Sequence, residues 1–304
     1  MVGKNDDLLK YPEYLQKMRT NPVANQGKGG YFSCQSGDKL YYRVWKGPEP
    51  GKILLCIHGL GMHGEYYIQV ADQLIDENLT IYALDLKHHG KSTGKKGDIK
   101  DFKELIEQVG EFVSFLKTKH ENHPIFLMGL SMGGCLAINY AVMFPETING
   151  IILMAPACTN VKISWTIILA MPVLGLIYLV RKGKPIIDIT KRQGEYTRNP
   201  LRIKYDKNDE LQITKLSLRY LFQVNKWIKK ANKYATNISS PALIMQGTQD
   251  KLIPLEGVRE FFNHIPIEDK QLIELDGAYH SLFSDPAMVE EGGWALLKNW
   301  ILSH

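Results

Sequence analysis

The pentapeptide GLSMG at residues 129–133 has the residue types and spacing of a nucleophilic site. It directly follows a short apolar run, Ile125–Met128, and leads into residues 134–141, which have the composition of a helix. A serine at a sharp turn between a strand and a helix is exposed to substrate and can attack a carbonyl carbon. The flanking glycines suit such a turn, because its backbone is strained and neighbouring chains pass close to it. We therefore predict that Ser131 is a nucleophile; an ordinary glycine-rich turn is the alternative.

A serine hydroxyl needs an oriented base that accepts its proton. His280 fits this role because it lies in a loop directly after the last apolar run, Gln271–Leu275. Other histidines fit less well, since they lie at expected helix ends, in surface loops or at the last position: His120, His123, His264 and His304. We predict that His280 is the base.

The carboxylate that orients such a base is expected at the end of the preceding strand. The apolar run Ala242–Met245 leads into the loop that holds Asp250. Asp276 and Asp285 are rivals because they lie closer to His280 in the sequence, but flexible neighbours of a base seldom orient it. We predict that Asp250 orients His280. The resulting chain order of serine, aspartate and histidine is the one that accompanies this serine motif.

The negative charge that develops on a carbonyl oxygen needs preorganised donors. We expect one donor to be the backbone N–H of Met132, at the start of a helix whose dipole favours negative charge. We assign the second donor to the backbone N–H of Leu60, in the loop HGLG at residues 58–61 that follows the apolar run Ile53–Ile57. His58 is interpreted as a buried structural histidine rather than a second base, because one base suffices.

The elements that must position these residues are short apolar runs separated by helical stretches. Runs this short, apolar on both faces, are typical of parallel strands covered by helices on each side. Between two of them Asp101 and Glu104 form an expected capping box, and apolar residues then recur on one helix face as far as Leu116. This alternation predicts a doubly wound, mostly parallel α/β sheet. The predicted strands are Lys39–Trp45, Ile53–Ile57, Thr80–Leu84, Ile125–Met128, Ile151–Met154, Ala242–Met245 and Gln271–Leu275.

The alternation stops over residues 156–240, where the sequence shows no strand of this kind. We predict a mainly helical lid insertion here, over the carboxyl edge of the sheet, where open α/β sheets bind their ligands. Residues 1–155 and 241–304 would then form the core domain. Within the lid, Ile163–Val180 has no charged residue, but Pro172 and Gly175 interrupt it, so we expect no membrane span.

Positive charge is concentrated in the predicted lid. Residues 157–240 hold 16 Lys and Arg against 5 Asp and Glu, a net charge of +11, which leaves the rest of the chain at −6. Two interpretations remain open, with a mobile lid in either. In one, the lid is apolar because it lines an acyl pocket. In the other, it also contacts an anionic membrane surface, with its basic residues at the headgroups.

The motifs resemble those of the monoacylglycerol lipase and lysophospholipase-like group of α/β hydrolases, which is of the serine aminopeptidase S33 type. The likeness runs from about Tyr41 to the C-terminus, without the insertion. It is carried by an oxyanion loop of the form HGxGxH, a stretch similar to DxxGHGxSxG, an acid loop and a base loop. In this sequence they are HGLGMH at 58–63, DLKHHGKSTG at 85–94, GTQD at 247–250 and GAYH at 277–280.

Two positions depart from the group, since His88 stands where the group usually has Gly and Met62 where it often has Glu. The resemblance implies an α/β-hydrolase fold and esterase or lipase activity on acylglycerols or similar lipids. The triad itself implies acyl transfer to water. We therefore expect a serine carboxylic-ester hydrolase that acts on monoacylglycerols or other single-chain lipid esters.

Three other functions remain open. A peptidase similar to prolyl aminopeptidases would need an acidic anchor for a free amino terminus, and the few lid acids, such as Glu195, do not obviously supply one. A feruloyl or other aryl esterase could use the same machinery. A lipid-binding protein with a vestigial triad would bind lipid without turnover.

Cofactors, metals and nucleic acid are not expected as partners. The sequence has no glycine-rich phosphate loop, no metal-ligand spacing and no nucleic-acid motif beside its basic segment. The four cysteines show no CxxC pairing and are typical of a reducing compartment. Met1–Lys10 is charged and lacks an apolar signal region, so we expect a cytoplasmic protein, with peripheral membrane contact if the second lid interpretation holds.

Overall fold

The computed structural model describes residues 27–47, 51–74, 78–159, 181–190 and 193–304. They form an eight-stranded sheet with the order β1-β2-β4-β3-β5-β6-β9-β10. β1 and β2 pair antiparallel with each other and β2 with β4, whereas every later pair in this order is parallel. The mostly parallel sheet is thus confirmed. Its strands are β1 Lys28–Ser33, β2 Lys39–Lys46, β3 Lys52–Ile57, β4 Leu79–Leu84, β5 Ile125–Leu130, β6 Gly150–Met154, β9 Ala242–Gly247 and β10 Lys270–Leu275.

The central strands are apolar on both faces because helices cover both sides of the sheet. In β3, Ile53, Leu55 and Ile57 belong to one core layer, while Leu54 and Cys56 belong to the other. All five side chains are at most 1% exposed. Burial of both faces explains why these strands are nearly continuous apolar runs rather than alternating ones.

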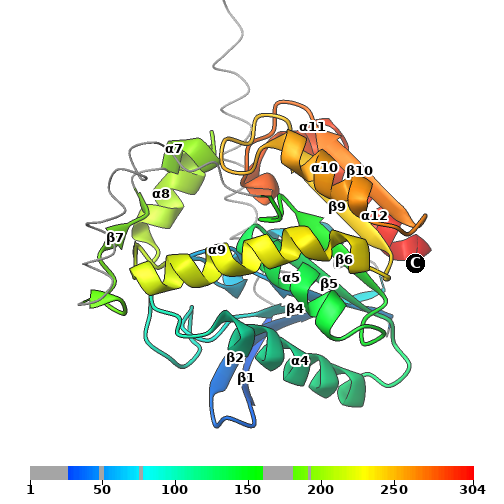
Figure 1. Ribbon diagram of the computed structural model, residues 1–304. Coiled ribbons are helices and arrows are strands. Elements are labelled where there is room, and N and C mark those ends of the chain that lie inside the picture. Colours follow the sequence, from blue (N-terminus) through cyan, green and yellow to red (C-terminus); the bar gives the residue numbers. More distant parts are fainter. Residues whose placement is uncertain (1–26, 48–50, 75–77, 160–180, 191–192) are drawn as a thin grey trace, which may run out of the picture.

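Two groups of helices enclose the sheet (Figure 1). The first group packs on one face: α4 Phe102–Lys119, α5 Met132–Met143, α9 Leu218–Lys233 and α10 Leu255–His264. The second packs on the other: α3 Ile68–Leu74, α11 Ala287–Glu290 and α12 Gly293–Ser303. Short 3-10 helices are η1 Gly64–Tyr67, η3 Tyr234–Asn237 and η4 Leu282–Ser284.

The start of α4 corrects one detail of the expected capping box. The Asp101 carboxylate accepts the backbone N–H of Lys103 at 3.0 Å, as a helix cap does. Glu104, however, does not reach back to Asp101; its carboxylate lies 2.6 Å from the Nζ of Lys87. The ion pair with Lys87 therefore replaces the second half of the capping box.

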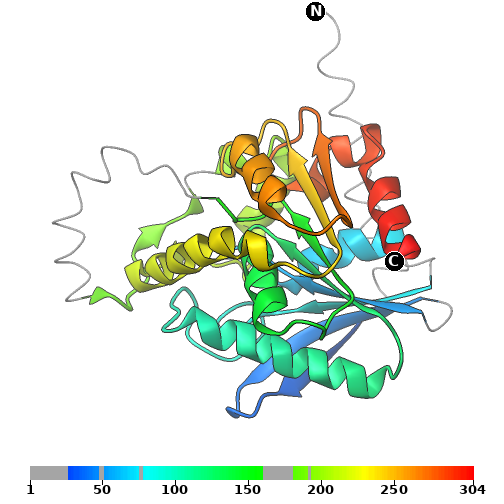
Figure 2. The same ribbon diagram turned by 45° about the vertical axis from the view of Figure 1, so that its right-hand side comes forward.

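The described part of residues 156–240 is mainly helical, but it also holds a small antiparallel sheet. Its elements are β7 Ile187–Asp188, α7 Gln193–Tyr196, α8 Pro200–Asn208, β8 Lys215–Leu216 and α9. In both overall views α9 lies across α5 (Figures 1 and 2). Trp227 of α9 stacks on Phe102 of α4 with ring centroids 5.9 Å apart, and its carbonyl accepts the side-chain amide of Asn139 in α5. The uncharged run Ile163–Val180 lies outside the described residues.

Candidate active site

Ser131 lies at a sharp turn between β5 and α5. Its φ of 54° and ψ of −113° are unusual for a residue with a side chain, and its hydroxyl does not cap the helix that it precedes. Gly133 makes this turn possible: a Cβ there would lie 2.1 Å from the carbonyl oxygen of Ile57. A strained backbone of this kind is typical of a functional residue that the surrounding structure holds in place.

The neighbouring strands fix the backbone of Ser131. Its N–H donates to the carbonyl of Met154 at the end of β6, and its carbonyl accepts the N–H of Ala157. The hydroxyl itself has no hydrogen-bond partner among the described residues, so the contact with His280 is not made here. Bonds between catalytic groups are often long in the absence of substrate.

His280 and Asp250 lie together after β10 and β9. The Nδ1 of His280 is 2.7 Å from Oδ2 of Asp250, and both side chains are almost completely buried. The other carboxylate oxygen accepts the backbone N–H groups of Leu252 and Ile253. Burial raises the pKa of Asp250, but its hydrogen bonds, first that with His280, outweigh burial and hold this pKa below its usual value. A carboxylate at Nδ1 leaves Nε2 of His280 free to accept a proton.

The two rival aspartates have other partners. Asp276 accepts the hydroxyl of Thr248 at 3.0 Å. Asp285 accepts the backbone N–H groups of Tyr279 and Ala287, so it shapes the loop on both sides of His280 without bonding the ring. The carboxylate that meets the imidazole is therefore that of Asp250.

The oxyanion loop runs directly beside Ser131. A Cβ on Gly59 would lie 3.4 Å from the Cβ of Ser131, so the residue that precedes Leu60 lies against the side chain of Ser131. The backbone N–H groups of Leu60 and Met132 have no hydrogen-bond partner among the described residues. Two such N–H groups beside a serine can stabilise a tetrahedral oxyanion.

His58 anchors this loop. Its Nδ1 lies 2.9 Å from the carbonyl of Gly59, and its Nε2 accepts the N–H of Leu86. Burial lowers the pKa of His58 to about 3, so the ring is neutral. This placement fits the structural role expected for His58.

Sequence reasoning missed the residues of the insertion that contact these loops. The N–H of Ile213 donates to the carbonyl of Gly61, and the N–H of Ser281 donates to the carbonyl of Tyr196. No sequence motif marks these contacts, because they join segments more than 80 residues apart through backbone groups.

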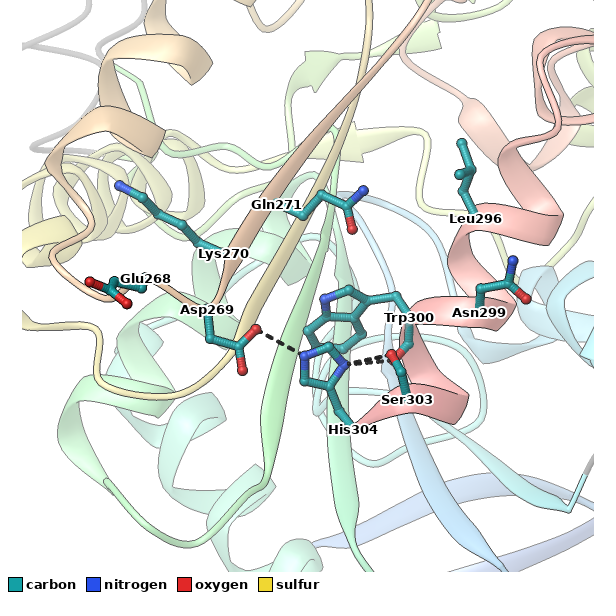
Figure 3. A pocket seen from close by; sticks show the side chains of 9 residues that line it. All are labelled: Glu268, Asp269, Lys270, Gln271, Leu296, Asn299, Trp300, Ser303 and His304. Carbon is teal, nitrogen blue, oxygen red and sulfur yellow. Dashed lines mark hydrogen bonds and ion pairs between the residues drawn. The ribbon is translucent and has the colours of Figure 1, made fainter.

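A second serine, histidine and aspartate set lies near the C-terminus, beside an open surface pocket of about 460 Å³ (Figure 3). Nε2 of His304 is 2.9 Å from Asp269, and its Nδ1 is 3.2 Å from the hydroxyl of Ser303. The hydroxyl of Ser303 donates its proton to the carbonyl of Trp300, and Nδ1 of His304 also bonds this carbonyl at the end of α12. This set lies at the amino end of β10, opposite the edge that holds His280, and has the contacts of a helix cap.

The described residues contain no cluster of side chains that could hold a metal ion. None of the helices formed by these residues is long and apolar enough to cross a membrane. The four cysteines, Cys34, Cys56, Cys135 and Cys158, are all buried free thiols.

A family model, curated relatives and solved structures all match most of this chain. Residues 48–287 match the family model "serine aminopeptidase, S33". The chain is 26% identical to a monoacylglycerol lipase of Mycolicibacterium smegmatis, covering 90% of this chain and 96% of the relative. It is 30% identical to phospholipase YtpA of Bacillus subtilis, covering 80% and 93%. The crystal structure of the Paleococcus ferrophilus monoacylglycerol lipase superposes with a TM-score of 0.75 at 29% identity, covering 87% and 99%.

Proposed function

Because the chain belongs to the serine aminopeptidase S33 family of α/β hydrolases and is a lipase or esterase, we propose that it hydrolyses monoacylglycerols or similar single-chain esters. The observation that carries the proposal is the 2.7 Å contact between His280 and Asp250 at the sheet edge that also holds the strained Ser131. Relatives named as monoacylglycerol lipases support the substrate class.

In the proposed reaction, Ser131 attacks the ester carbonyl while Nε2 of His280 accepts its proton. The N–H groups of Leu60 and Met132 stabilise the oxyanion. His280 then gives the proton to the leaving alcohol, which breaks the ester bond and leaves an acyl-enzyme. Water then attacks the acyl carbon while His280 accepts its proton, and His280 returns that proton to the oxygen of Ser131 as the acyl–enzyme bond breaks and the fatty acid leaves. Asp250 holds the imidazole in the tautomer that these steps need and stabilises its charged form.

The contacts of Asp206 count against its use as the acidic anchor that a peptide with a free amino terminus would need. Asp206 already accepts hydrogen bonds from Tyr66, Tyr196 and Arg202. Its carboxylate is therefore committed within the protein and is not an open anchor for a substrate ammonium group. Aryl esters are accepted by the same chemistry and are distinguished by the substrate series below.

A basic face of α9 supports the additional proposal of contact with anionic membrane. Phe222 is 43% exposed, and Lys226, Lys229 and Lys233 are exposed. Residues at this spacing lie along one side of a helix, so three ammonium groups and an aromatic ring share one surface. Such a face is suited to the headgroup region of an anionic bilayer.

The test is hydrolysis of p-nitrophenyl esters from acetate to palmitate, and of monoacylglycerols, by the wild type and Ser131→Ala. We expect turnover of medium- or long-chain esters and of monoacylglycerol by the wild type, and none above background by the variant. Ser303→Ala, the serine beside His304, is the matched control and should keep full activity. Wild-type turnover of p-nitrophenyl esters without turnover of monoacylglycerols would favour the aryl esterase, and turnover of aminoacyl amides alone the peptidase. Tight lipid binding without turnover of any substrate would favour a binding protein.

A further inference from the structure

A cluster of buried and partly buried polar side chains lies between the oxyanion loop and α7 and α8. We call it the junction cluster: His63, Tyr66, Tyr196, Arg202, Asp206 and Asp209. Arg202 and Asp206 are 4% and 2% exposed, which is rare for charged residues in a chain whose other lysines and arginines are mostly at the surface. A buried group of this kind persists only when its members satisfy one another.

Asp206 is the centre of the junction cluster. One carboxylate oxygen accepts the hydroxyl of Tyr66 at 2.8 Å and the Nε of Arg202 at 2.8 Å. The other accepts the hydroxyl of Tyr196 at 2.9 Å. The guanidinium of Arg202 also lies over the ring of Tyr66, 4.0 Å from its centroid. Burial lowers the pKa of Arg202, but the charge of Asp206 outweighs burial and keeps the guanidinium protonated.

Asp209, the residue after α8, makes a second connection to the same part of the core. Its Oδ2 lies 2.7 Å from Nε2 of His63 and 3.0 Å from the hydroxyl of Tyr66. His63 and Tyr66 directly follow the loop that passes beside Ser131. The two carboxylates of the insertion therefore hold the segment that carries the Leu60 N–H.

The same stretch of the insertion reaches both sides of the candidate site. On one side, the N–H of Ile213 donates to the carbonyl of Gly61 in the oxyanion loop. On the other, the carbonyl of Tyr196 accepts the N–H of Ser281, the residue after His280. Tyr196 thus bonds the base loop through its backbone and Asp206 through its hydroxyl.

We propose that Asp206 is a positioning residue that holds the oxyanion loop and the base loop in one arrangement through Tyr66 and Tyr196. The proposal rests on the proposed ester hydrolysis by Ser131. It assigns the insertion a part in the chemistry, in addition to covering the acyl chain. Positions of reacting groups matter strongly, since a shift of about 1 Å can change a rate about a hundredfold.

The length of the substrate's acyl chain distinguishes a positioning residue from a residue that only lines the acyl pocket. A lid that only lines the acyl pocket affects long-chain esters, because acetate makes almost no contact with it. A residue that positions the oxyanion donors and the base affects every ester, acetate included. Loss of Asp206 should therefore lower kcat for short and long chains by a similar factor and leave KM for acetate almost unchanged.

The experiment compares the wild type, Asp206→Ala, Tyr66→Phe and Tyr196→Phe on p-nitrophenyl acetate and laurate. We expect Asp206→Ala to lower kcat at least about tenfold on both esters. The tyrosine variants keep the ion pair of Asp206 with Arg202, so they remain testable if Asp206→Ala does not fold. Each should lower kcat on both esters by a smaller factor. Glu210→Gln, an exposed carboxylate in the same segment, is the control and should match the wild type.

Hydrogen exchange supplies a measurement that does not depend on activity. Peptides that span residues 59–67 and 278–285 should exchange faster in Asp206→Ala, or in both tyrosine variants, than in Glu210→Gln. Unchanged exchange in both peptides, or a loss of kcat on laurate alone, would overturn the proposal. If the wild type hydrolyses no ester while the exchange result holds, the proposed function fails and the structural coupling stands.

Discussion

Nδ1 of His280 lies 2.7 Å from Oδ2 of Asp250, and the second oxygen of this carboxylate is held by two backbone N–H groups, those of Leu252 and Ile253. Oδ2 also accepts the side-chain amide of Gln246, so the carboxylate cannot rotate without losing four hydrogen bonds. This arrangement fixes the tautomer of His280 with its proton on Nδ1. It follows that the imidazole presents an unprotonated Nε2 to the substrate side.

Asp250→Asn should lower kcat by about 10⁴-fold with little change in KM, because the asparagine amide can favour the wrong tautomer of His280. Steady-state hydrolysis of p-nitrophenyl butyrate at pH 8 measures the effect. Asp276→Asn removes a carboxylate that bonds Thr248 in the adjacent loop and should leave kcat within about twofold of the wild type. Equal losses in the two variants would contradict the assignment of Asp250.

The residues of the candidate site could be located from the sequence because each follows an apolar strand. Ser131 follows β5, Asp250 follows β9 and His280 follows β10. The carboxyl ends of parallel strands share one edge of the sheet, so residues in these three loops are expected to converge. The sequence could not show the separation of Ser131 from His280, because it depends on side-chain conformation.

A second prediction concerns the pH dependence of stability. Burial lowers the pKa of His58 to about 3 in the folded protein, whereas an unfolded histidine has a pKa of about 6.5. Between these values the unfolded chain binds a proton that the folded protein does not, so the free energy of unfolding falls as the pH falls. His58 alone should remove about 2 kcal/mol between pH 8 and pH 5.

Urea unfolding at the two pH values tests this expectation with His58→Gln as the comparison. The wild type should lose more stability than the variant on acidification, and the difference is the contribution of His58. Burial also lowers the pKa of His89 strongly, and His58 lowers it further, so the difference between the two proteins includes the coupling of His58 with His89. The same loss in both proteins would show that His58 does not titrate on unfolding.

A third prediction compares two glycine substitutions, Gly133→Ala and Gly110→Ala, which should have opposite effects on stability. A Cβ at Gly133 would lie 2.1 Å from the carbonyl oxygen of Ile57, so Gly133→Ala must displace the strand that leads to the oxyanion loop. A Cβ at Gly110, inside α4, would make only ordinary contact at 3.5 Å with the ring of Tyr140. Gly110→Ala should therefore stabilise the protein by about 0.5–1 kcal/mol through helix propensity.

Thermal unfolding and esterase assays distinguish the two glycine variants. We expect Gly133→Ala to unfold at a lower temperature and to lose most of its activity, and Gly110→Ala to unfold at a higher temperature with normal kcat. Full activity in Gly133→Ala would show that the turn at Ser131 tolerates a shift of its neighbours.

Other parts of the structure had no usable signal in the sequence. β1 has the sequence KGGYFS and is mostly exposed, and its two glycines and weak alternation do not indicate a strand. It forms because β2 offers an antiparallel edge.

Arg202 and Asp206 lie four residues apart on a polar helix, which is the usual pattern of a surface pair. Only the fold brings Tyr66, 140 residues away from Asp206, to bury that pair.

A fourth prediction concerns the basic face of α9, where Lys226, Lys229 and Lys233 lie along one side. Each lysine near an anionic surface contributes about 1 kcal/mol, so replacing all three with Gln should weaken binding to anionic vesicles about a hundredfold. Sedimentation with phosphatidylcholine vesicles that contain 30% phosphatidylglycerol measures this partition.

A triple Gln variant at Lys100, Lys117 and Lys119 removes the same charge from exposed positions elsewhere and should bind almost as the wild type does. Equal losses in both triple variants would mean that net charge, rather than this face of α9, governs the contact. Equally strong binding to neutral and to anionic vesicles would exclude an electrostatic contact. An electrostatic contact needs negative lipid headgroups and is weakened by salt.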